Sequence, residues 1–186
     1  MRDSQPRGSL AGMLLLAHPA LSDKNFRRTV VLLAAHDPDS GAMGVILNRP
    51  MGRSLGEAVE GFSRSALGGV PLYAGGPVET DRVLFAAWRR DASQRRLQVH
   101  FGINRDTAER LLRESPETSV RAFLGHYGWS SGQLEGELKG DGCIVRRPDF
   151  VILSGPQGVA LWRALLGPTT PDIRLLADAP DEPAKN

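Results

Sequence analysis

The segment from Phe26 to Asn48 constrains the fold most, because it predicts a β-hairpin without help from the rest of the chain. The first strand is predicted over residues 26–36, because residues 29–33 read Thr-Val-Val-Leu-Leu, a β-branched and apolar run typical of a buried strand. Residues 37–41 then supply Asp, Pro, Asp, Ser and Gly, which favour a turn. A second strand is predicted over residues 42–48, and Asn48-Arg49-Pro50 ends it.

The rest of the chain adds short strands and short helices in no regular alternation. Strands are predicted at residues 12–18, 71–74, 83–88, 97–101, 119–124, 143–145 and 150–153, with 83–88 and 97–101 forming a second hairpin. Helices are predicted from a capping box at Ser54 to about Phe62, after Asn104, over 130–140 and over 158–166. Without βαβ repeats, this order favours an α+β or mixed α/β sheet over a doubly wound parallel one.

Length and composition indicate one globular domain over residues 1–186, with residues 1–9 and 171–186 as peripheral surface tails. No apolar run approaches the roughly 20 residues of a membrane helix, so we expect a cytoplasmic protein. The single cysteine, Cys143, excludes an intrachain disulfide and fits a small core residue. The formal net charge of +2 is spread along the chain and indicates an anionic partner only weakly.

Residues 125–135 concentrate three glycines, a tryptophan, a tyrosine and a histidine in eleven positions. Gly128 to Gly132 fits the G-x-S-x-G pattern, with a predicted strand before it and a helix after it. A serine hydrolase is nevertheless the less favoured interpretation, because all four histidines precede Ser130 in the chain. The alternative interpretation is that Ser130 caps the following helix and Gln133 returns the hydrogen bond.

Three other segments suggest anion contacts, each with a plain structural alternative. Asn48 and Arg49 place an amide and a guanidinium at a strand end, where a surface salt bridge is equally expected. Gly75 and Gly76 could present backbone N–H groups to an anion or simply allow positive φ in a turn. Arginines cluster at the tip of the second hairpin, where a solvated turn is the commoner outcome: Arg89, Arg90, Arg95 and Arg96. No DNA-reading motif accompanies them, so direct DNA binding is not expected.

Metal and cofactor sites are not indicated. The four histidines (His18, His36, His100 and His126) show no metal-ligand spacing, and His18 and His36 fit polar strand ends. Glu135 and Glu137 are two residues apart and do not share a helix face, which argues against paired carboxylate catalysis. We therefore expect no metal, no cofactor and no catalytic residue.

Four blocks of the chain together resemble the AlgH/YqgE family of bacterial proteins. They are Leu14-Leu-Leu-Ala-His-Pro19 with Asp23 and Phe26, Gly41-Ala-Met-Gly-Val-Ile-Leu-Asn-Arg-Pro50, Gly75-Gly-Pro-Val78, and Gly128-Trp-Ser-Ser-Gly-Gln-Leu-Glu135. The resemblance covers roughly residues 10 to 167. It implies a bifurcated sheet or pseudo-barrel flanked by helices, in a family without an established biochemical activity. The label of transcriptional regulator that one member gave the family is a name rather than a mechanism.

The chain departs from the family pattern at two positions. Gly142-Cys143-Ile144 stands where the family has a tryptophan, and His126 stands where an aromatic residue is more usual. A site that needs that tryptophan would be altered here, and His126 is a poor candidate for a shared catalytic base.

Two functional hypotheses follow from these residues. The preferred one is a binding protein in which two strand-exit loops line one pocket for a small anionic or nucleotide-like ligand, through Asn48, Arg49, Gly128, Trp129, Gln133 and Glu135. The alternative is a regulatory or protein-interaction module that acts without catalysis through an exposed Trp129 and the arginine hairpin. The sequence specifies neither the ligand nor the oligomeric state.

Overall fold

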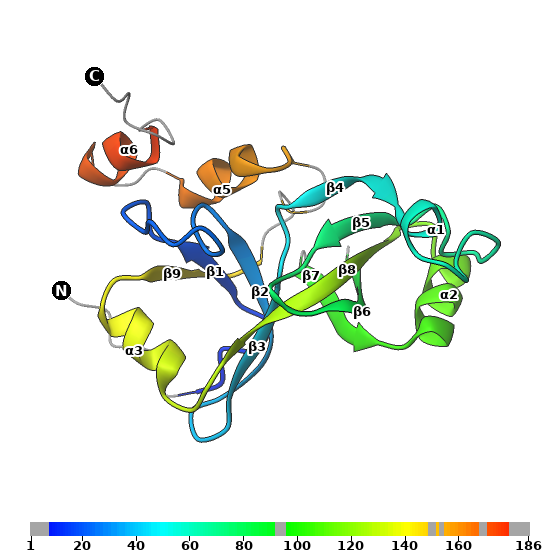
Figure 1. The fold of residues 1–186 in the computed structure, drawn as a ribbon, viewed down its shortest axis with the longest axis horizontal. Helices are drawn as coiled ribbons and strands as arrows, with labels where there is room; N and C mark the ends of the chain where they lie inside the picture. The colour runs from blue at the N-terminus through cyan, green and yellow to red at the C-terminus, as the bar shows by residue number, and fades with distance from the viewer. Residues whose placement is uncertain (1–7, 92–95, 149–151, 153–154, 168–170, 179–186) are drawn as a thin grey trace.

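The computed structural model describes residues 8–91, 96–148, 152, 155–167 and 171–178 (Figure 1). Within these residues, nine strands form one sheet in the order β4-β5-β8-β3-β2-β1-β9, and β6 pairs with both β7 and β8. The strands are β1 (Leu14–Ala17), β2 (Val30–Asp37), β3 (Gly41–Ile46), β4 (Pro50–Ser54), β5 (Pro71–Ala74), β6 (Val78–Asp91), β7 (Arg96–Ile103), β8 (Thr118–Trp129) and β9 (Cys143–Arg146).

Short helices flank this sheet on three sides. They are α1 (Leu55–Ala58), α2 (Arg105–Glu114), α3 (Gln133–Lys139), α5 (Val159–Leu166) and α6 (Pro171–Asp178). Figure 1 shows α1 and α2 at one end of β8, α3 at the other end, and α5 beside β1 and β2, with α6 next to α5. Every strand pairing is antiparallel except that of β5 with β8. The predicted α+β class, with a largely antiparallel bifurcated sheet, is confirmed.

Several local predictions are confirmed by contacts. The β2–β3 hairpin forms as the turn residues indicated, and Asp37 Oδ1 accepts the backbone N–H of Asp39 and Ser40. Asn104 caps α2, because its side-chain oxygen accepts the N–H of Thr107 at 2.8 Å. The second hairpin also forms, although β6 is much longer than the predicted strand.

Other predictions were wrong in extent or kind. The first strand of the hairpin begins at Val30 rather than Phe26, because Asp23 accepts the N–H groups of Asn25 and Phe26 and holds a turn. Strand β4 was not predicted, and α1 is only four residues long. The tail from residue 171 begins with α6, whose Ala177 is buried in the core. The predicted strand at 150–153 lies, apart from buried Ile152, outside the described residues.

The largest difference concerns residues 125–129, which were expected as a loop and form the second half of β8. Residues 118–124 of β8 pair with β5 and β6, Val78 of β6 pairs with His126, and the last three residues of β8 pair with β3. Between the two halves, the chain at Gly75 and Gly76 passes directly against Gly125 and His126. A Cβ on Gly75 or Gly76 would overlap a carbonyl oxygen of that stretch, and Gly125 itself has φ of 72°. Glycine is therefore required by close backbone approach.

Three hydrophobic clusters share this sheet. The first includes Trp88, Phe123 and Trp162, and the third includes Phe85 and Val120 with partly buried α2 residues packed against it. The second cluster contains Trp129 and Leu134, and it packs the far end of β8 against α3. Phe123 and Trp129 are six residues apart, so in a regular strand they would point to the same face of the sheet. They belong to different clusters, so β8 changes face where it passes Gly75 and Gly76, which we call the glycine crossing.

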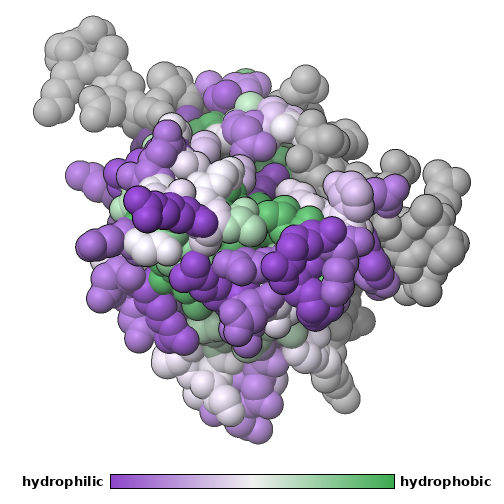
Figure 2. Space-filling view, turned by 90° about the vertical axis from the view of Figure 1, so that its right-hand side faces the viewer, coloured by the Kyte–Doolittle hydropathy of each residue, from purple (hydrophilic) through white to green (hydrophobic). Residues whose placement is uncertain are grey.

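The surface over α1 and α2 is mostly hydrophilic, with hydrophobic side chains visible in a central band (Figure 2). In the part of the chain that the structure describes, every helix is too short or too polar to cross a bilayer.

The glycine crossing predicts unequal effects of two alanine substitutions in the same region. Gly76→Ala should lower the free energy of unfolding by about 2–3 kcal/mol, because the added methyl group meets the His126 backbone. Gly128→Ala is the matched control, since a Cβ there meets nothing within 4 Å. Urea denaturation of both variants checks this, and equal losses would contradict the role of the crossing.

Candidate functional site

Three aromatic rings form the centre of the candidate site. Tyr127 and Trp129 point to the same side of β8, with ring centroids 5.0 Å apart. Phe26, from the turn before β2, lies 5.3 Å from Tyr127 and 6.3 Å from Trp129. Such tilted and edge-on arrangements are favourable beyond simple area burial. The rings join the turn at residues 23–28 to β8.

Trp129 is buried, with 4% of its surface exposed. Its Nε1–H donates to Glu137 Oε2 at 2.9 Å, so both the ring and its polar atom have partners. The hypothesis that Trp129 is an exposed protein-binding residue was therefore wrong. The ring packs against Leu134 of α3 and Ala42 of β3, which belong to the same hydrophobic cluster.

Arg49 follows β3 and reaches the same neighbourhood. Its Nη2 donates to the Lys24 carbonyl oxygen at 3.3 Å, and among the described residues it forms no ion pair. The guanidinium is half-buried, and burial lowers its pKa, while Tyr127 and Asp23 act in the opposite direction. Arg49 and Tyr127 are thus close enough to interact electrostatically, and Tyr127 in turn packs on Trp129.

The Tyr127 hydroxyl stands among three charged groups. Burial, followed by the negative charges of Asp23 and Glu137, raises the pKa of the phenol, and Arg49 opposes this. The hydroxyl is therefore protonated at neutral pH and can donate a hydrogen bond. The described residues offer it no hydrogen-bond partner.

Asn48, the neighbour of Arg49, has a different position from the one expected of a ligand-binding residue. It is 4% exposed, and its side-chain oxygen accepts the N–H of Val30 at 2.8 Å. Its amide nitrogen donates to the carbonyl oxygens of Arg28 and Gly158 at 2.9 and 3.1 Å. Both amide hydrogens are thus committed to the backbone. Asn48 ties the start of β2 to the loop before α5.

The residues around Ser130 lead into α3 and do not form a nucleophile site, but the N-cap of α3 is Gly132 and not Ser130 as predicted. Gln133 Oε1 accepts the backbone N–H and the hydroxyl of Ser130, at 3.0 and 3.2 Å, and its Nε2 donates to Glu137. None of the four histidines, all of which lie in the described part, hydrogen-bonds to Ser130. Gly128 is exposed on the opposite side of β8 from the aromatic rings.

Glu135 belongs to a neighbouring contact with His36. The N–H of Leu10 donates to His36 Nδ1 at 2.9 Å, so the ring proton is placed on Nε2, which donates to Glu135 Oε1 at 2.7 Å. This hydrogen bond is the main cause that lowers the pKa of Glu135. Because both ring nitrogens are occupied, His36 connects the N-terminal segment to α3 and is not free to act as a base.

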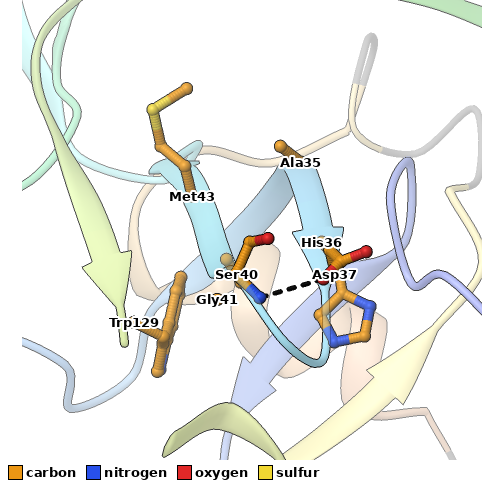
Figure 3. Close-up of a pocket in the computed structure, with 8 residues that line it drawn as sticks. Ala35, His36, Asp37, Ser40, Gly41, Met43 and Trp129 are labelled. Atoms are coloured by element: carbon orange, nitrogen blue, oxygen red, sulfur yellow. Dashed lines mark hydrogen bonds between the residues drawn. The ribbon is translucent and has the colours of Figure 1, made fainter. Parts of the chain in front are cut away.

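A shallow hollow of about 340 Å³ opens beside this contact (Figure 3). The β2–β3 hairpin and one edge of β8 line it, with Ala35, His36, Asp37, Ser40, Gly41, Ala42, Met43 and Trp129. Figure 3 shows the Trp129 ring beside Gly41, the Met43 side chain farther along β3, and the Asp37–Ser40 hydrogen bond in the hairpin turn. His36, Asp37 and Trp129, which line the hollow, already have hydrogen-bond partners within the chain.

The predicted anion contacts elsewhere are separate from the Arg49–Tyr127 pair. The Gly75 N–H donates to the Leu124 carbonyl at 2.7 Å and cannot bind an anion. For Gly76, the close approach of β8 accounts for the glycine. Arg89 lies on β6 and donates to Gln98, and Arg90 pairs through its backbone with Leu97, its side chain being outside the described part.

Metal and thiol chemistry receive no support from the geometry. Across the described ranges, no three His, Cys, Asp or Glu side chains are grouped to hold a metal ion. Cys143 is buried, and burial raises the pKa of its thiol to about 12. The thiol therefore stays protonated at neutral pH and is a core group.

Sequence reasoning missed Tyr127 and Asp23 as members of this neighbourhood. Tyr127 lies two residues before Trp129, so period-two alternation could have placed both on one side of a strand. The alternation is hard to detect because the glycines at 125 and 128 favour a loop prediction for residues 125–129. Asp23 has a local role, the turn to Phe26, and its proximity to Arg49 depends on tertiary packing.

The chain is similar throughout its length to proteins of one family. The model of the AlgH-like family matches residues 14–174. A UPF0301 protein of Streptomyces coelicolor is 36% identical and one of Chlorobium luteolum is 34% identical, with 94–96% of each chain covered. The solution structure of AlgH from Pseudomonas aeruginosa aligns with a TM-score of 0.63 at 28% identity, covering 97% of this chain and 98% of that one. A crystal structure from Corynebacterium diphtheriae, at 20% identity and a TM-score of 0.69, covers 96% of this chain and 95% of that one and shares the fold.

The hydrogen bonds of Asn48 predict that this residue stabilises the fold. Asn48→Asp should lower the free energy of unfolding by about 3 kcal/mol, because a buried carboxylate faces two carbonyl oxygens that have lost their donor. Asn104→Asp is the matched control, since aspartate caps a helix as well as asparagine does. Thermal or urea denaturation measures both, and a near-neutral Asn48→Asp would contradict the structural role.

Proposed function

Given that this chain belongs to the AlgH-like family, we propose that it is a binding protein for a small anionic ligand held by Arg49 and the Tyr127 hydroxyl. The observation that carries the proposal is a half-buried guanidinium without a carboxylate partner among the described residues, beside a phenol that has a hydrogen to donate. A bound oxyanion would supply the missing acceptor to both groups.

The energetics favour a ligand over an empty site. Removing Arg49 from water costs free energy that one long hydrogen bond to the Lys24 carbonyl offsets only in part. Arg49 and Tyr127 belong to different strand ends. Arg49 follows the buried Asn48, and Tyr127 packs on the buried Trp129. Preorganised donors of this kind lose little entropy when a ligand arrives.

The charges around the pair restrict the class of ligand. Asp23 and Glu137 both place negative charge near the Tyr127 hydroxyl. A second or third negative charge on the ligand would be repelled by these carboxylates, which favours a small monocarboxylate over a polyphosphate. Phe26 and Trp129 are buried, so neither offers a face for stacking a nucleobase. The nucleotide-like ligand is therefore the less supported form of the proposal.

Binding without catalysis fits the same geometry. Ser130 is hydrogen-bonded within its own helix start, and His36 has both ring nitrogens occupied. The described part of the chain therefore offers no nucleophile with an adjacent base near Arg49. Any regulatory role, in a cytoplasmic setting, would follow from occupancy of this site. The alternative, a protein-docking surface, loses its central residue because Trp129 is buried.

Titration calorimetry with acetate, inorganic phosphate and AMP tests the proposed site. Acetate should bind the wild type, and Arg49→Met should weaken that binding roughly 10- to 100-fold, the range expected for a lost charged hydrogen bond. Tyr127→Phe should weaken it less, because only a neutral donor is removed. AMP and phosphate should bind more weakly than acetate.

Arg53→Met provides the control, because Arg53 is an exposed arginine on the adjacent β4. It changes the net charge by the same amount without touching the Arg49–Tyr127 pair. The proposal fails if Arg49→Met and Arg53→Met reduce acetate binding equally, or if the wild type binds none of the three probes.

A further inference from the structure

A second arginine, Arg121, lies in the first half of β8 and is 4% exposed. Its Cζ atom is 5.1 Å from the Tyr73 ring centroid and 5.2 Å from that of Trp88. Its Nη2 donates to the Ile152 carbonyl oxygen at 2.6 Å. The guanidinium is thus placed between two aromatic rings in the cluster that packs beneath α5, separate from the aromatic rings beside Arg49.

The positive charge of Arg121 has no counterion within the described chain. It makes no ion pair there, and its Nη1 is buried without any hydrogen-bond partner. Burial lowers the pKa of the guanidinium, with Tyr73 as the only opposing influence. Contact with two ring faces offsets part of the desolvation cost, but a ring face does not accept the in-plane N–H bonds of Nη1.

Trp88 carries a second buried donor without a hydrogen-bond partner. The residue is fully buried, and its indole Nε1–H also lacks a hydrogen-bond partner. Tyr73 and Gln157, the nearby polar side chains, are bonded to each other at 3.2 Å. The two other tryptophans have partners, since Trp129 donates to Glu137 and Trp162 to the Ala17 carbonyl. Trp88 is therefore the exception among the three indoles.

Both unsatisfied groups are donors, and one carries a full positive charge. The missing species must therefore accept hydrogen bonds, and negative charge on it would also balance the arginine. We propose that Arg121 Nη1 and Trp88 Nε1 hold a small oxyanion, a carboxylate or a phosphate, over the paired strands β8 and β6, on the side of the sheet that carries the first hydrophobic cluster. A buried water could accept a hydrogen bond, but it would leave the charge uncompensated.

Nuclear magnetic resonance offers a direct test, because each tryptophan gives one indole N–H peak. Wild-type protein in low-salt HEPES buffer without added halide is titrated with acetate and, separately, with inorganic phosphate. The Trp88 peak, assigned with Trp88→Phe, should move downfield and saturate as its N–H gains an acceptor. The Trp162 peak is the internal reference, because its partner is a backbone carbonyl. Comparison of the two probes distinguishes a carboxylate site from a phosphate site.

Two variants separate this site from the Arg49 site. Arg49→Met should leave the movement of the Trp88 peak unchanged, and Arg121→Met should abolish it while acetate binding at Arg49 persists. A Trp88 peak that stays in place with both probes overturns the proposal, whether or not Arg121→Met folds. Equal movement in wild type and Arg121→Met overturns it as well.

Discussion

The structure depends on the passage of β8 past Gly75 and Gly76 at backbone contact distance. Any side chain at those positions would collide with the carbonyl groups of Gly125 or His126. Because the strand can pass so closely, it pairs with β5 before the crossing, with β3 after it, and with β6 up to His126. One strand thereby joins both branches of the sheet and contributes to all three hydrophobic clusters.

The same strand brings polar groups into two different surroundings. Before the crossing, Arg121 is enclosed by aromatic rings, and after it, Tyr127 meets Arg49 from the end of β3. In each place a guanidinium has lost water without forming an ion pair among the described residues, although Asp23 lies near enough to Arg49 to act on its pKa. Burying a cation without an ion-pair partner costs free energy, so such a residue is expected mainly where a ligand supplies the negative charge. A rigid sheet is well suited to hold such sites in fixed geometry.

Local chemistry accounts for what the sequence predicted well. The β-branched run before Asp37 and the turn residues after it specify the first hairpin. Asn104 caps α2 through a hydrogen bond to a residue only three positions later in the chain. These features need no knowledge of the rest of the chain. The overall class followed because hairpins and short helices without βαβ repeats leave few alternatives.

The incorrect predictions concern residues whose structural contacts lie far away in the sequence. Gly125 looked like a loop residue, although its neighbours across the crossing are fifty positions earlier in the chain. Asn48 looked like a surface amide, but two of its three bonds span 18 and 110 residues. Arg121 could have been noticed as a charge inside the apolar run Val120 to Leu124, yet its lack of a counterion becomes visible only in three dimensions.

Arg49 and Arg121, the two arginines beside β8, are each proposed to bind a small anion. Both sites can be examined at once in a crystal soaked in bromide, a small monoanion with a strong anomalous signal. We expect anomalous peaks within contact distance of Arg121 Nη1 with Trp88 Nε1, and of the Arg49 guanidinium with the Tyr127 hydroxyl. Peaks confined to exposed arginines such as Arg53, with water or nothing at both buried sites, would contradict both proposals.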